Sequence, residues 1–177
     1  GTNRQFSETR SRLHMFNGAG MLHQVQIRDG RAWYSNKYVR TSRFEHEREA
    51  GRELYPEFGD IAGNGKKGFA RIISNVMEQR FGLVPKMSSV ENASATTAIQ
   101  CHHGKLYALQ ETAYPFALKT RFEDGLLVLT GEGQFDAMGG VLQGPFTAHP
   151  KIDPQTGDWH SFSTKLQTGS ISYSVLS

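Results

Sequence analysis

The chain contains the stretch Gly144-Pro145-Phe146-Thr147-Ala148-His149-Pro150-Lys151-Ile152-Asp153-Pro154, in which one histidine stands directly before a proline and an Asp-Pro turn signal follows. A residue before proline is pushed out of the helical region, so we expect His149 in extended backbone. Pro150 has no N–H to donate and therefore belongs at a strand end or a sheet edge. Imidazole is the commonest transition-metal ligand, and a stiff backbone would fix its direction. His149 is therefore a candidate metal ligand, with a purely structural histidine as the alternative.

Most of the remaining sequence predicts antiparallel hairpins. Strand-like runs alternate with turn signals such as Asp29-Gly30 and Asp124-Gly125. The expected hairpins join residues 21–27 with 31–41, 96–101 with 105–111, 115–119 with 126–130, and 146–153 with 159–165, and a further strand covers 171–176. In residues 21–27 apolar side chains occupy alternate positions, so they lie on one face of the expected strand. Short strands at this spacing indicate an all-β sandwich, barrel or propeller.

Residues 66–81 break this pattern and predict a minor helical insertion. Apolar side chains recur there at helical spacing, basic residues bracket them, and Gly82 and Pro85 end the segment. Two interpretations stay open. The apolar face packs on the sheets, as in an ordinary amphipathic helix, or it touches a membrane surface. The apolar positions are Phe69, Ile72, Ile73, Val76 and Met77.

Composition narrows the classes of function. The 177 residues are one domain's length, and 37% hydrophobic with 21% charged residues is ordinary for a globular protein. A net charge of +3 with scattered basic residues does not indicate nucleic-acid binding. Cys101 is the only cysteine, so no disulfide can form within this chain.

The run Phe146–Pro154 resembles the motif around the first iron-binding histidine of the carotenoid cleavage oxygenases. Further segments match that family in the same order and extend the resemblance over nearly the whole chain, with the plant and algal branch most similar. These segments are Met15-Phe16-Asn17-Gly18-Ala19-Gly20-Met21-Leu22-His23, Tyr34–Thr41, Glu47–Gly51 and Leu106–Glu111.

The resemblance implies a seven-bladed β-propeller with iron on its central axis. A blade takes roughly 40–50 residues, so this chain would supply three or four blades. We therefore expect residues 1–177 to be the N-terminal part of a longer propeller domain, completed by the remainder of the propeller or by a partner chain. In the family four histidines hold ferrous iron, and only His149 falls on one of those motifs here.

Glu111 matches a family glutamate that hydrogen-bonds a ligand histidine. Such a carboxylate fixes the orientation of the ring and tunes the metal. The alternative is a surface glutamate at a strand end.

Two other groups of residues suggest chemistry less strongly. His102 and His103 precede Gly104 and are expected to be turn residues, which chelate poorly. The loop Asn17–Gly20 lacks the lysine of a phosphate-binding loop and is expected to be a tight turn entering a strand. The family usually has aspartates in place of Asn17 and Ala19. No Ser-His-Asp or paired-carboxylate arrangement is evident.

The leading hypothesis is a non-haem iron(II) dioxygenase that cleaves a carotenoid or apocarotenoid double bond with O₂ to give two carbonyl products. Its substrate would reach the iron through an apolar tunnel, for which Phe146 is a candidate lining residue. The second hypothesis is a non-catalytic relative that serves as a structural subunit of a larger assembly, and the third is a small β-rich binding module. The algal-like resemblance favours the plastid, with the cytoplasm as the alternative.

Overall fold

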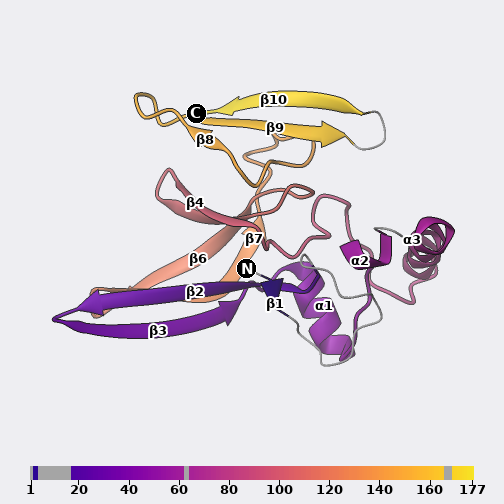
Figure 1. Ribbon diagram of the computed structural model, residues 1–177, viewed down its shortest axis with the longest axis horizontal. Coiled ribbons are helices and arrows are strands. Elements are labelled where there is room, and N and C mark those ends of the chain that lie inside the picture. The colour runs from indigo at the N-terminus through magenta and orange to yellow at the C-terminus, as the bar shows by residue number, and fades with distance from the viewer. Residues whose placement is uncertain (1, 4–16, 62–63, 166–168) are drawn as a thin grey trace.

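The computed structural model describes residues 2–3, 17–61, 64–165 and 169–177. Within these ranges the chain forms three antiparallel sheets and three helices (Figure 1). The predicted predominance of β-structure with a minor helical part is confirmed. The helices gather on one side of the sheets (Figure 1), and they are α1 (Ser42–Ala50), α2 (Phe58–Ile61) and α3 (Gly65–Arg80).

The first sheet has the order β1-β2-β3, formed by β1 (Thr2–Asn3), β2 (Ala19–Arg28) and β3 (Arg31–Tyr38). Asp29 and Gly30 both have positive φ, at 50° and 72°, which confirms the predicted tight turn. The predicted apolar face of β2 points outward. Val25 and Ile27 are 62% and 78% exposed, whereas Leu22 on the opposite face is buried.

The second sheet is a four-stranded meander whose strands pair in chain order. Its second hairpin turns at Asp124 and Gly125, which have φ of 51° and 75°. Both predicted hairpins are confirmed, with the last two strands longer than expected. The strands are β4 (Ala98–His102), β5 (Lys105–Leu109), β6 (Phe116–Glu123) and β7 (Leu126–Phe135).

The third sheet has the order β10-β9-β8, with β8 (Lys151–Ile152), β9 (Trp159–Lys165) and β10 (Ser170–Leu176). The predicted strand over residues 146–153 is reduced to the two residues of β8, so the expectation of a strand through His149 is wrong. Pro150 has no N–H to donate to a neighbouring strand. Phe146, at the start of the predicted strand, donates its N–H to the carbonyl of Ala113 at 2.9 Å and not to β9.

Buried apolar clusters join neighbouring sheets. Between the second and third sheets, Trp159 packs with Tyr107 and Phe146 at ring-centroid distances of 5.2 and 5.3 Å. Between the first and second sheets, Leu22 packs with Phe116 and other residues of the meander. These clusters fix the sheets that position the cavity described below.

The sequence prediction missed α1, which directly follows the expected strand over residues 31–41. Thr41 caps its N-terminus, since the side-chain oxygen accepts a hydrogen bond from the N–H of Phe44 at 3.2 Å. Gly51 ends it in the left-handed conformation with φ of 65°. Both capping residues, Thr41 before the helix and Gly51 after it, are of types that commonly mark helix ends in a sequence.

Helix α3 confirms the predicted insertion at 66–81, but the interpretation that its apolar face packs on the sheets is wrong. Phe69 and Val76 are 65% and 56% exposed, whereas Asn75 is buried and donates to the carbonyl of Leu54 at 2.9 Å. Gln79 is bonded on the same side and accepts from the N–H of Met87. The helix therefore meets the protein with its polar side. None of the helices in the described ranges is long and apolar enough to cross a bilayer.

Candidate functional site

His149 projects from a buried segment of backbone. It lies in a bend just before β8, with Ala148 and Pro150 buried on either side, while its own side chain is 65% exposed. The backbone N–H donates to Oγ1 of Thr147 at 3.1 Å. The backbone of His149 is thus held in place while most of its imidazole is exposed.

Glu111 is the nearest carboxylate to this imidazole, with Oε1 3.3 Å from Nε2 of His149. It lies in a turn two residues beyond the end of β5 at Leu109, and not within a strand as predicted. Its second oxygen, Oε2, accepts a hydrogen bond from Oγ1 of Thr97 at 3.4 Å. The structure therefore brings both predicted site residues together, although 38 positions separate them.

Both residues line a cavity of about 540 Å³. Its wall is built from segments far apart in the sequence, which include the glycine-rich loop, helix α1 and the segment before β4. Among the lining residues are Gly18, Arg43, Glu57, Asn92, Glu111 and His149. No spacing pattern in the sequence would have predicted that Glu111 and His149 share a cavity with the other four residues, which are Gly18, Arg43, Glu57 and Asn92.

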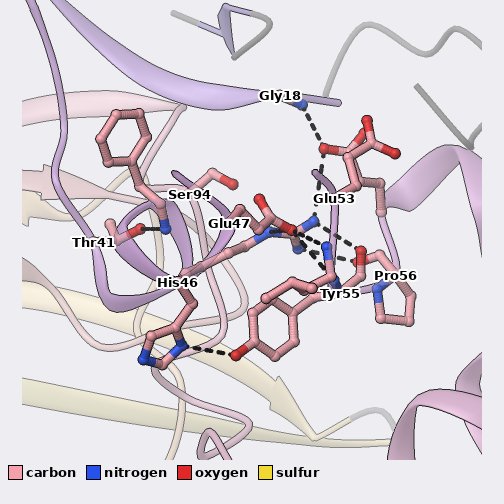
Figure 2. Close-up of polar contacts among 12 residues, drawn as sticks. Gly18, Thr41, His46, Glu47, Glu53, Tyr55, Pro56 and Ser94 are labelled. Atoms are coloured by element: carbon pink, nitrogen blue, oxygen red, sulfur yellow. Dashed lines mark hydrogen bonds and ion pairs between the residues drawn. The ribbon is translucent and has the colours of Figure 1, made fainter. Parts of the chain in front are cut away.

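Arg43 anchors one side of this wall through a buried polar network that includes Glu47, Tyr55 and Pro56, which Figure 2 labels. Its guanidinium donates to the carbonyls of Pro56 and Tyr55 at 3.0 and 3.1 Å. It also lies 3.5 Å from Glu47 and 3.6 Å from Glu57. Because both carboxylates are buried, Arg43 supplies the positive charge that they need.

Glu57 links this network to the glycine-rich loop. Its Oε1 accepts from the N–H of Gly18 at 3.0 Å, and Figure 2 shows the loop approaching the network at this point. Burial raises the pKa of Glu57, while the charge of Arg43 opposes this shift. Gly18 has φ of 112° directly before β2, so the predicted turn entering a strand is confirmed. Asn17 accepts from the N–H of Gly59 at 2.9 Å, and Met15 and Phe16 of the same motif lie outside the described residues.

Two further expectations need correction. His102 is the last residue of β4 and is buried, with its ring stacked on Trp159 at 4.2 Å between centroids, so only His103 is a turn residue. Burial, together with His103, lowers the pKa of His102. Phe146 is 1% exposed inside the core cluster and does not line the cavity.

The donor set fits one ligand of a shared metal centre. A neutral imidazole nitrogen suits ferrous iron, and an adjacent carboxylate is the usual partner of a ligating histidine. Within the described part of the chain, no three His, Cys, Asp or Glu side chains gather as a metal site. His149 would therefore hold a metal only together with ligands from outside these residues.

Loops between strands present an imidazole and a carboxylate into one cavity, an arrangement that suits one part of a metal site. All 177 residues match the family described as retinal pigment epithelial membrane protein, and the chain belongs to this family of carotenoid oxygenases. It is 38% identical over 164 residues to carotenoid 9,10(9′,10′)-cleavage dioxygenase 1 of Arabidopsis thaliana, covering 93% of this chain and 29% of that protein. It is 33% identical over 150 residues to resveratrol cleavage oxygenase 1 of Chaetomium globosum, covering 84% of this chain and 21% of that protein.

The structure is similar to solved oxygenases. The crystal structure of Pseudomonas brassicacearum lignostilbene dioxygenase matches 99% of this chain and 32% of its own, with a TM-score of 0.68 and 26% identity. The match supports a propeller-type fold. The chain thus spans about a third of the solved structure and 29% of the Arabidopsis relative.

Proposed function

We propose that this chain is part of a non-haem iron(II) dioxygenase that cleaves a carotenoid or apocarotenoid double bond to two carbonyl products. The supporting observation is the contact of His149 with Glu111 at the wall of a 540 Å³ cavity. Family membership agrees with it, since its curated relatives include carotenoid cleavage dioxygenases and the family generally depends on iron.

In this proposal His149 supplies one neutral nitrogen ligand. Iron held there would supply the activation of dioxygen for addition to the double bond. Glu111 would fix the orientation and tautomer of a ligand imidazole, and its 3.3 Å contact with His149 supports His149 as that imidazole. Thr97, bonded to the other oxygen of Glu111, would hold the carboxylate in place.

We propose further that residues 1–177 form the N-terminal three or four blades of a seven-bladed propeller. Apolar side chains on the outer face of β9 and β10 support this, because such a face is normally covered. Phe162, Ile171 and Tyr173 are 58%, 72% and 67% exposed. The remainder of the propeller, or a partner chain, would pack there.

For the compartment we propose the plastid. One relative, from Arabidopsis thaliana and 31% identical over 166 residues, is named a probable chloroplastic carotenoid cleavage dioxygenase 4. The cytoplasm is the alternative. Localisation of a fluorescent fusion of the full-length protein distinguishes the two.

The iron content of the full-length protein tests the main proposal. We expect about one iron per polypeptide and a several-fold loss of iron in His149→Ala. His103→Asn is the matched control, since His103 is exposed away from the cavity and asparagine tolerates its φ of 45°. An iron-free protein that copurifies with a stable partner would contradict the proposal and favour the structural-subunit hypothesis.

We also propose that α3 touches a membrane surface. Its exposed apolar side chains, with Lys66 and Arg80 on the same side, suit insertion at a lipid interface. Phe69→Ser with Val76→Ser should reduce cosedimentation with vesicles of mixed neutral and anionic lipid. Phe122→Ser, which removes a 74% exposed side chain elsewhere, is the control. Equal losses in both variants would contradict a specific role of α3.

A further inference from the structure

The buried core next to the candidate site contains Trp159. This fully buried indole belongs to the same apolar cluster as Leu109 and Ala148. Ala148 directly precedes His149, and Leu109 lies two residues before Glu111. Because core side chains are closely packed, a shift of the indole is passed on to the neighbours of both site residues. The position of Trp159 therefore bears on the contact between His149 and Glu111.

His102 covers one face of this indole. The two rings stack at 4.2 Å between centroids with 10° between their planes, and His102 is 7% exposed. Within the described residues the imidazole makes no hydrogen bond, and Nε1 of Trp159 has no partner. The contact between the end of β4 and the start of β9 thus depends on the stacked rings and on no polar bond between them.

His102 also lines a second cavity, of about 420 Å³, together with His103, Lys105, Tyr107 and Asp136. The ammonium of Lys105 lies 3.9 Å from a carboxylate oxygen of Asp136, so their charges oppose each other. Tyr107 is uncharged near neutral pH because burial raises its pKa to about 12. Protons can reach His102 from solvent through this cavity.

An uncharged imidazole is favoured at this position. Burial lowers the pKa of His102, and the adjacent His103 adds to the shift, while Asp158 opposes it. The unfolded chain takes up this proton near pH 6.5, whereas the folded protein takes it up only at a lower pH. The contribution of His102 to stability is therefore complete above pH 6.5 and is lost as the pH falls below that value.

We infer that His102 is a positioning residue for the pair of His149 and Glu111. Its uncharged ring holds Trp159, and Trp159 holds the core against which both site residues lie, so protonation of His102 loosens the site from the far end of β5. A preorganised site tolerates displacements of only about 0.5 Å. This inference rests on the proposed dioxygenase function, in which the pair belongs to the iron centre.

The test compares three variants of the full-length, iron-loaded protein with the wild type, from about pH 5.5 to about pH 8. His102→Phe keeps a ring against Trp159 but cannot take up a proton, whereas His102→Ala removes the ring. His23→Phe, which removes an exposed imidazole on β2, is the matched control. The measurements are kcat and KM for an apocarotenal, the bound iron, and the free energy of unfolding.

His102→Phe should have the kcat of the wild type near pH 8 and about threefold the wild-type kcat near pH 5.5, because the titrating group is gone. Its free energy of unfolding should fall less steeply below pH 6.5 than that of the wild type. His102→Ala should lose about threefold or more in kcat and in bound iron at every pH, with little change in KM. His23→Phe should follow the wild type.

Parallel pH profiles of the wild type and His102→Phe would overturn the inference. Wild-type kcat and iron content in His102→Ala would overturn it as well. If His102→Ala does not fold, the comparison of His102→Phe with the wild type still decides. If even the wild type cleaves no substrate, the dioxygenase function fails, and the unfolding free energies of the wild type and His102→Phe then decide separately whether the stacked contact is acid-sensitive.

Discussion

The Cβ position of Gly131 would lie 2.0 Å from the carbonyl oxygen of Tyr38, so β7 passes the end of β3 with no room for a side chain. Gly131 also has φ of 78°, a conformation that L-residues with a side chain rarely adopt. Its carbonyl accepts from the N–H of Arg40 at 2.8 Å. This close approach joins the first hairpin to the meander.

Gly131→Ala should therefore lower the free energy of unfolding by about 2–4 kcal/mol, since the clash adds to the backbone strain. Urea unfolding of the full-length protein measures it. Gly139→Ala is the control, because Gly139 has φ of 65° but nothing within 4 Å of its Cβ position. Gly139→Ala should lower the free energy of unfolding by about 1 kcal/mol. Equal effects of the Gly131 and Gly139 substitutions would contradict a specific contact with Tyr38.

Arg43→Met should destabilise the protein by about 3–5 kcal/mol, because it leaves the buried carboxylates of Glu47 and Glu57 without their cation. Arg121→Met is matched in chemistry but removes an exposed pair with Glu123, and should change the free energy of unfolding by less than about 1 kcal/mol. Chemical denaturation compares the two. If both substitutions change the free energy of unfolding by a similarly small amount, the buried network around Arg43 does not stabilise the fold.

Thr41→Val should cost about 1 kcal/mol, since it keeps the shape of the side chain but removes the oxygen that caps α1. Thr41→Ser should retain most of the stability because its hydroxyl still accepts from Phe44. The midpoint of thermal unfolding reports both changes. A larger loss in the serine variant would assign the role of Thr41 to packing of its methyl group.

Two tyrosines should resist ionisation in the folded protein. Burial raises the pKa of Tyr55 and of Tyr107 to about 12, with Glu47 and Asp136 adding to the respective shifts. The unfolded state loses these protons near pH 10, so the folding stability is complete below pH 10 and falls as the pH rises toward 12. Absorbance of tyrosinate during an alkaline titration measures this. Tyr55→Phe and Tyr107→Phe should each remove one late-titrating group, and an unchanged curve would contradict the assignment.

Local features of the fold were predictable because they depend on neighbouring residues. The turn at Asp124-Gly125 and the span of α3 follow from residue types at fixed offsets. The caps of α1, Thr41 and Gly51, were equally local, but the prediction placed Thr41 at the end of a strand and assigned no helix after it. The orientation of α3 was not predictable, since periodicity defines an apolar face but not what that face meets.

The sequence by itself determined the β-rich class, the hairpin turns, and His149 and Glu111 as candidates, because each depends on short-range chemistry or on a motif. Only the tertiary structure decided that these two side chains lie 3.3 Å apart in a cavity shared with Arg43, Glu57 and Asn92. That grouping results from the packing of sheets and helices whose segments are distant in the chain, and no local pattern encodes such distances.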